Sequence, residues 1–224
     1  MKRLLLLFIL FVPASYVFAY DDIFAVQSDP NYIPIPQDQN FTKQPLFFCD
    51  VSVGSGFSLG NLTNIYRFAP YLDFLIGLPI QQKGSAIYLG LTFSFPVNCQ
   101  SFEFTDKGTA YKTKATSLIG LNLRYSDRII LNKNLFLDPY LGIGYIGLST
   151  NLVKDTYQDD EGNYQTDYQS ADALDLFAGI RLSYKRLSYF IEYHQTTLSN
   201  SSKLPNNFGN TFLNMGFAYS FLLY

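Results

Sequence analysis

The residues nearest to a catalytic pattern lie late in the chain, in the segment HQTTLSNSSKLPNNFGN at 194–210. His194 and Thr196 are two residues apart, so they would share one face of an extended strand. A histidine base beside a hydroxyl is the arrangement that activates a nucleophile for hydrolysis. Such a site also needs a group that orients the base, and none is evident here. We therefore predict no catalytic residues and interpret His194 as a structural histidine that hydrogen-bonds near Glu192 or to Asp73.

Other residues that could bind a ligand form weaker patterns. The acidic segment 154–172 contains Asp159, Asp160 and Glu161, whose oxygens suit Ca²⁺, but their spacing does not match an EF-hand loop. A solvated loop is the better interpretation. The sequence has no glycine-rich phosphate loop, zinc-ligand spacing or basic nucleic-acid patch, and its net charge is -2. We predict no cofactor, no metal site and no nucleic-acid partner.

The start of the chain predicts export. Lys2 and Arg3 precede an apolar run at 4–12, and small residues follow up to Ala19. This is the pattern of a secretory signal peptide at 1–19, since the apolar run is shorter than the about 20 residues of a membrane helix. The proline-rich polar segment 20–45 predicts a disordered periplasmic leader. The remaining residues, 46–224, are enough for one domain.

Alternation with a period of two dominates this domain. The chain is 17% aromatic and only 15% charged, against about 25% charged in ordinary domains. Alternating apolar residues predict an all-β fold. We expect eight strands at about 46–58, 67–80, 85–96, 111–125, 135–149, 172–184, 187–198 and 211–223.

The two faces of these strands differ in kind. One face is bulky and apolar, as in Leu72, Phe74, Ile76 and Leu78. The other face is rich in glycine and carries the charged residues Asp50, Asp73, Lys112, Lys114, Arg124, Asp138, Asp175, Arg181 and Glu192. A soluble sandwich or lipocalin-like barrel would bury the apolar face. Glycines and opposite charges instead suit a narrow lumen, which favours a transmembrane antiparallel up-and-down β-barrel.

The connections between the strands alternate in length, as in outer-membrane barrels with long outward loops and short periplasmic turns. The short connections are 81–84 and 185–186, and 126–134 is longer than this scheme prefers. The long polar connections are 59–66, 97–110, 150–171 and 199–210.

Three segments resemble the small OmpA-like, or porin-family, outer-membrane barrels of Gram-negative bacteria, in particular those of Bacteroidota. They are DPYLGIGYIGLS (138–149), LDLFAGIRLSYKRLSYFIEYH (174–194) and NMGFAYSF (214–221). The resemblance implies a cell outer membrane location, contact with outer-membrane lipids and lipopolysaccharide, and insertion by the barrel-assembly machinery. In that family a closing aromatic residue is the insertion signal, here Phe221 or Tyr224.

The segment 194–210 also distantly resembles the His-x-Ser-Asn segment of outer-membrane lipid A deacylases. Thr196 stands where that family has Ser, Thr197 where it has Asn, and Asn210 near the expected Glu. Three functions stay open. The first is a structural, adhesive or surface-interaction barrel whose loops meet an extracellular partner. The second is a lipid A-modifying hydrolase, and the third is a narrow channel. We favour the first, without enzymatic activity, because an eight-stranded barrel is filled by its own side chains.

The topology also predicts particular pairs. Cys49 lies at the inner start of the first strand and Cys99 beyond the outer end of the third, so we expect no disulfide between them. On neighbouring strands of the charged face, we expect ion pairs within the lumen. The expected pairs are Arg124 with Asp138 and Arg181 with Glu192.

Overall fold

The computed structural model describes residues 47–80, 85–158 and 164–223. The predicted signal peptide and leader, the 81–84 connection, Asp159, Asp160, Glu161 and Tyr224 lie outside the described residues.

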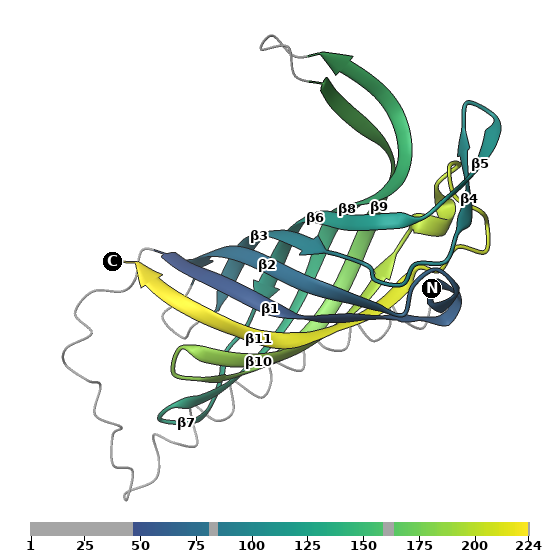
Figure 1. Ribbon diagram of the computed structural model, residues 1–224. Coiled ribbons are helices and arrows are strands. Elements are labelled where there is room, and N and C mark those ends of the chain that lie inside the picture. The colour runs from purple at the N-terminus through teal and green to yellow at the C-terminus, as the bar shows by residue number, and fades with distance from the viewer. Residues whose placement is uncertain (1–46, 81–84, 159–163, 224) are drawn as a thin grey trace, which may run out of the picture. The chain divides into compact units, whose positions relative to one another are not determined.

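Eight antiparallel strands form a closed barrel, which confirms the predicted fold class (Figure 1). Each strand pairs with its neighbours in chain order, and β11 pairs with β1 from Phe47↔Leu223 to Leu59↔Thr211. The wall strands are β1 Phe47–Leu59, β2 Phe68–Pro79, β3 Ala86–Ser94, β6 Ala115–Ser126, β8 Leu135–Gln158, β9 Tyr164–Tyr184, β10 Leu187–Thr196 and β11 Thr211–Leu223. Closure satisfies the backbone groups of the wall, as a hydrocarbon surrounding requires. Among the described residues, no helix has the length and apolar character needed to cross a membrane.

The wall strands turn their apolar face outward and their charged face inward. Large apolar side chains such as Val53, Ile76, Leu121 and Phe217 are about half exposed on the outside. The charged residues of the inner face are buried: Asp50, Asp73, Arg124, Asp138, Asp175, Arg181 and Glu192. This inside-out arrangement is that of a membrane barrel, with lipid outside and a polar lumen.

Two lysines depart from the prediction. Lys112 and Lys114 were expected in the lumen but are exposed. The strand predicted at 111–125 begins only at Ala115, and the residues before it form β5 (Thr109–Thr113). β5 pairs with β4 (Phe102–Asp106) in a separate hairpin, so β5 is not part of the barrel wall and its side chains do not line the lumen.

One end of the barrel, which we expect to face the periplasm and call the inner end, has tight turns. Between β9 and β10, Lys185 has φ 55°, as in the primed turns of two-residue hairpins. The predicted connection 126–134 is not a loop, because β7 (Ile129–Asn132) continues β6 and pairs with β8 as Ile129↔Leu137. The chain therefore turns only at Lys133–Asn134, and the moderate inner connection expected at 126–134 is corrected to a broken strand with a short turn.

The opposite end, which we expect to face outward and call the outer end, is closed by an apolar plug that three connections build. η1 (Gly60–Asn64) and the residues after it come from the first connection, the β4–β5 hairpin from the second, and η2 (Leu198–Asn200) with its following loop from the last. Their buried side chains form one cluster with the barrel wall. From the connections, the plug includes Leu62, Ile65, Tyr66, Phe102, Phe104, Leu198, Leu204 and Phe208. The segments expected as long outward connections at 59–66, 97–110 and 199–210 are therefore partly folded into the plug.

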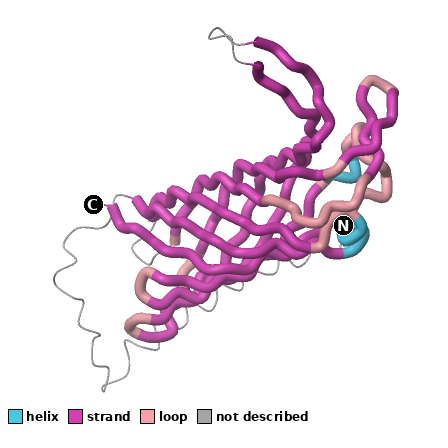
Figure 2. The backbone as a smooth tube through the Cα atoms, in the orientation of Figure 1, coloured by secondary structure: helices cyan, strands magenta, loops and turns pink. Residues whose placement is uncertain are grey.

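The β8–β9 hairpin extends past the barrel wall at this outer end (Figure 2). Pairing of β8 with β6 stops at Thr150 and pairing of β9 with β10 stops at Asp175, but β8 and β9 continue together to Gln158↔Tyr164. We call residues 151–158 and 164–170 the arm. Its register shifts between Ser149 and Asp155, where bulges bend a ribbon. The predicted loop at 150–171 is thus largely a two-stranded ribbon.

Candidate functional site

The polar residues of the lumen form a connected network around Glu192 on β10. Arg124 Nη2 lies 3.3 Å from Glu192 Oε2 and 3.4 Å from Asp73 Oδ2. The Tyr71 hydroxyl donates to Glu192 Oε1 at 3.0 Å, and the Tyr140 hydroxyl donates to Oε2 at 2.9 Å. Arg124 from β6, Asp73 from β2 and Glu192 from β10 therefore meet across the lumen, and side chains fill the space between them.

These contacts correct both predicted ion pairs. Arg124 contacts Glu192 and Asp73 rather than Asp138, because the β6–β8 register sets Arg124 opposite Gly142. Asp138 instead receives a two-fold contact from Arg128, with Nε at 2.7 Å from Oδ1 and Nη2 at 3.1 Å from Oδ2.

The second predicted pair fails in a similar way. Arg181 forms its ion pair with Asp50 on β1 and not with Glu192. Arg181 faces Phe190 across the hairpin, while Glu192 faces Gly179. Glu192 thus lies one lumen position further from the turn, within reach of Arg124. Arg124 and Arg181 therefore form ion pairs with carboxylates across the lumen and not with the predicted carboxylates on neighbouring strands.

His194 lies beside this network, as predicted, and its contact with Glu192 is present. Its Nε2 is 3.2 Å from Glu192 Oε1, and its Nδ1 is 2.8 Å from Asp175 Oδ2. The imidazole is stacked between Phe177 and Phe212, with ring centroids 5.0 and 4.4 Å away. Both nitrogens and both ring faces are therefore occupied.

Asp175 is the orienting carboxylate that sequence reasoning did not find. The tight turn at 185–186 fixes the β9–β10 register and sets Asp175 opposite Thr196, next to the lumen position of His194. Counting residues outward in both directions from that turn places Asp175 beside His194 from the sequence alone. A base–carboxylate pair thus exists, but the nucleophile does not complete it. The Thr196 hydroxyl donates to the Asn210 carbonyl at 3.1 Å and lies 3.5 Å from the Leu198 amide nitrogen.

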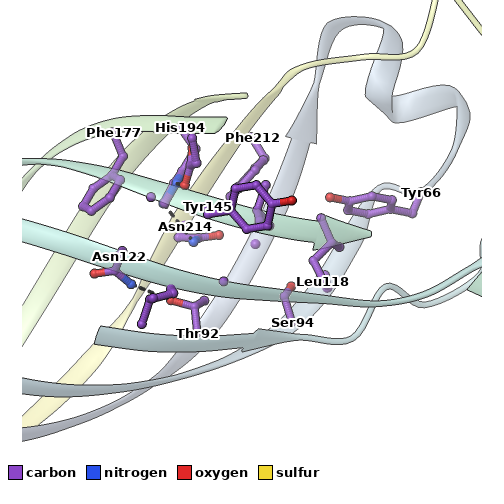
Figure 3. A pocket seen from close by; sticks show the side chains of 17 residues that line it. Tyr66, Thr92, Ser94, Leu118, Asn122, Tyr145, Phe177, His194, Phe212 and Asn214 are labelled. Carbon is purple, nitrogen blue, oxygen red and sulfur yellow. Dashed lines mark hydrogen bonds and ion pairs between the residues drawn. The ribbon is translucent and has the colours of Figure 1, made fainter. Parts of the chain in front are cut away.

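A small cavity lies in the lumen just outside this network, as Figure 3 shows. Its volume is about 30 Å³. His194, Asn214 and Asn122 line it toward the network, whereas Tyr66 and Leu118 line it toward the plug. A cavity of this size holds one or two waters and is far smaller than the clefts of about 300–1,000 Å³ that bind organic ligands.

The two cysteines are both free, which confirms the prediction that they do not pair. Cys49 lies in β1 near the inner end, and Cys99 lies at the outer end between β3 and β4. Cys99 packs against the plug, and burial raises the pKa of its thiol, which the charge of Lys114 only partly offsets.

No protein-family profile and no curated protein matches the chain at a significant level. Among the solved structures that resemble it are several outer-membrane proteins, which share little sequence identity with it. The N-terminal β-barrel domain of OprF from Pseudomonas aeruginosa is 12% identical, with a TM-score of 0.39, and the match covers 80% of this chain and 100% of that one.

A major outer membrane protein from Thermus thermophilus is 18% identical, with a TM-score of 0.40, over 77% of this chain and 99% of that one. Ail, the attachment invasion locus protein of Yersinia pestis, is 11% identical, with a TM-score of 0.40, over 78% of this chain and 99% of that one. Likenesses at this level assign no activity. The closed wall, apolar outer belt and charged lumen themselves define a transmembrane β-barrel of an outer membrane.

Proposed function

We propose that this protein is a non-enzymatic outer-membrane barrel that acts by surface contact, with the arm as its contact element. The observation that carries this proposal is the extension of β8 and β9 past the barrel wall. Beyond Asn151 on β8 and before Ser170 on β9, the outer edges of the ribbon have no neighbouring strand among the described residues. Unpaired strand edges are surfaces to which another extended chain can add.

The side chains of the arm support the same role. Val153 and Tyr168 are cross-strand partners, and each is more than half exposed. An apolar pair held out in water beyond a membrane wall stabilises little within the chain, and exposed apolar groups of this kind mark interaction sites. Asp155 and Asp167 are also direct partners, and together with Lys154 they leave the arm with a net charge of −1. A partner with an extended apolar edge and some basic character fits this surface.

The interior offers less support for the two other functions. The plug and the lumen network leave a cavity of only about 30 Å³, which disfavours a conducting path. His194 has an orienting carboxylate, but the Thr196 hydroxyl donates its hydrogen bond to the Asn210 carbonyl. His194 and Thr196 also face the lumen rather than the lipid. A lipid A acyl chain would reach the barrel from the lipid side, so we propose no hydrolase activity.

We also infer membership of the small OmpA-like group of barrels. The support is the eight-stranded up-and-down order and the closing strand β11, whose outward residues include Phe217, Tyr219 and Phe221. The partners that follow are outer-membrane lipids with lipopolysaccharide, the barrel-assembly machinery during insertion, and an extracellular partner at the arm.

The test compares cells that express the wild type with cells whose arm is shortened. Residues 152–169 are replaced by an Asn-Gly turn, which suits a two-residue hairpin. We measure self-aggregation and attachment to a cultured-cell monolayer. The wild type should raise at least one of these several-fold, and the shortened variant should fall to the level of cells without the protein.

Point variants make the comparison sharper. Tyr168→Ser should reduce the effect, whereas Tyr111→Ser on the β4–β5 hairpin, where Tyr111 is 41% exposed, should not. Equal attachment by the wild type and the shortened variant, with both barrels folded in the outer membrane, would contradict the proposal. Liposome swelling with small sugars tests the channel, and we expect none above protein-free vesicles.

A further inference from the structure

Two neighbouring turns at the inner end of the barrel bring exposed cations together. Lys133 lies in the Lys133–Asn134 turn between β7 and β8, and Lys185 and Arg186 form the turn between β9 and β10. The two turns lie next to each other, because the Lys185 backbone amide donates to the Asn134 carbonyl at 3.1 Å (Figure 1). We call them the paired turns. Three exposed positive residues thus lie on one side of the barrel rim.

The charge of the paired turns is not neutralised within the described part of the chain. No described carboxylate forms an ion pair with any of the three cations. The nearby Arg128 is engaged with Asp138. Asp127 is the other charge at this end outside an ion pair, and its Oδ1 accepts from the Ser85 hydroxyl at 2.7 Å and from the Arg128 amide at 3.0 Å. Three positive charges and one negative charge leave a net charge of +2 there.

The lipid-facing surface of the wall extends almost to the paired turns. The outward row nearest to them consists of cross-strand partners on β8, β9, β10 and β11, namely Leu135, Tyr184, Leu187 and Tyr219. The three cations lie within two residues of this row in the chain, which is about 7 Å along a strand. On each side of a hydrocarbon core of about 30 Å, the lipid head groups form a layer of about 5–7 Å. The paired turns therefore lie at head-group depth.

The surroundings of Lys185 favour a lipid partner over a soluble one. Its Nζ lies over the ring of Tyr184, 5.5 Å from the centroid, and the Tyr184 side chain is more than half exposed on the lipid face. Tyrosines and basic side chains of this kind are typical of the boundary between lipid and water. A zwitterionic head group carries both signs of charge, so it neutralises little of a net positive charge. An anionic head group is complementary to it.

We propose that the paired turns bind the head group of an anionic phospholipid of the phosphatidylglycerol type, with Lys133, Lys185 and Arg186 as its contacts. The phosphate accepts charge-assisted hydrogen bonds from the ammonium and guanidinium groups. This inference rests on the proposed contact with outer-membrane lipids and adds a lipid class and a position to it. It does not depend on the role of the arm. The bound lipid links the β7–β8 and β9–β10 hairpins at the membrane surface.

The experiment uses the full mature chain refolded into phosphatidylcholine vesicles. In a Cys49→Ser, Cys99→Ser background, Asn134→Cys carries a fluorescent dye beside the cations, since Asn134 is exposed. Trace phosphatidylglycerol or phosphatidylcholine with a nitroxide near the top of one acyl chain quenches the dye on contact. At equal lipid fraction, we expect phosphatidylglycerol to quench about fivefold more steeply, the ratio for about 1 kcal/mol of attraction to a basic residue. About 1 M NaCl should reduce this excess, because salt screens exposed charges.

Two triple variants test whether the preference arises at the paired turns. The first neutralises their cations by Lys133→Gln, Lys185→Gln and Arg186→Gln, and it should make the two lipids quench equally. The matched control neutralises three exposed cations at the outer end by Arg67→Gln, Lys107→Gln and Lys112→Gln, and it should keep the full excess. Both variants should fold as the wild type does in phosphatidylcholine alone, because all six side chains are exposed.

Two results would overturn the proposal. The first is equal quenching of the wild type by both lipids, which would mean that the cations meet a partner other than an anionic lipid. The second is an excess that survives in the first triple variant, which would locate the lipid preference elsewhere on the protein. Both leaflets of these vesicles have the same composition, so the result does not depend on the orientation of the barrel. Failure here would therefore leave the proposed role of the arm standing.

Discussion

Replacement of Arg124 by Met removes the cation at the centre of the lumen network. The Arg124 side chain is 4% exposed, and it contacts the carboxylates of Asp73 and Glu192, which are 0% and 1% exposed. It also lies over the Tyr140 ring, 4.6 Å from the centroid. Breaking a buried ion pair from one side costs about 3–5 kcal/mol, because a buried charge loses its partner. We therefore expect Arg124→Met to lower the free energy of unfolding by this amount.

Loss of Arg124 should destabilise the buried charge of Asp73 more than that of Glu192. Glu192 keeps three neutral donors, from Tyr71, Tyr140 and Asn214. Asp73 keeps the hydroxyl of Thr92. Neutralising Asp73 in the Arg124→Met background should thus restore more stability than neutralising Glu192, with Asp73→Asn recovering at least half of the loss.

The assay is urea unfolding of the refolded barrel in lipid vesicles, followed by circular dichroism because the chain has no tryptophan. Arg186→Met is the matched control, since Arg186 is exposed at the β9–β10 turn, and it should change the free energy of unfolding by less than about 0.5 kcal/mol. A loss below about 1 kcal/mol for Arg124→Met, or no recovery with either neutral partner, would refute the ion-pair assignment.

Three further outcomes are expected. Gly142→Ala should destabilise the barrel by about 1–3 kcal/mol in the same assay, because the added methyl would overlap the Phe177 ring and lie 2.7 Å from the Leu123 carbonyl oxygen; a neutral effect would contradict the packing. Maleimide labelling of Cys99 should be slow at neutral pH, since burial raises the pKa of its thiol and leaves less thiolate; the rate should reach half its maximum at a higher pH than for an unhindered cysteine peptide, and the same midpoint for both would argue against burial. Lipid A from cells expressing wild type, His194→Ala and Thr196→Ala should be identical by mass spectrometry, and loss of an acyl chain with the wild type alone would make the protein an enzyme.

The strand pattern could be predicted from the sequence because it is local. Alternation has a period of two, so apolar residues such as Leu72 and Phe74 identify the lipid face without knowledge of their neighbours. The same alternation assigned Asp73, Arg124 and Glu192 to the lumen, where they lie buried. The predicted strand ends failed where tertiary contacts decide them. Residues 109–113 pair with β4, which is part of the plug, and the outer halves of β8 and β9 pair only with each other.

Ion-pair partners could not be predicted in this way, because closure of the barrel brings together strands that are distant in sequence. Arg124 and Glu192 are on β6 and β10, and Arg181 and Asp50 are on β9 and β1. These contacts depend on the stagger of the whole sheet, which no single hairpin reveals. The Asp175–His194 contact is different, since the turn at 185–186 fixes the register of that hairpin. It could have been read from the sequence alone.

The central claim is that the barrel spans the outer membrane with its arm outside and its tight turns inside. In a Cys49→Ser, Cys99→Ser background, Val153→Cys marks the arm and Lys185→Cys marks the β9–β10 turn; both positions are exposed. A membrane-impermeant maleimide added to intact cells should label position 153 at once and position 185 only after the outer membrane is permeabilised. Labelling of position 185 but not 153 on intact cells, or equal labelling of both, would contradict the account.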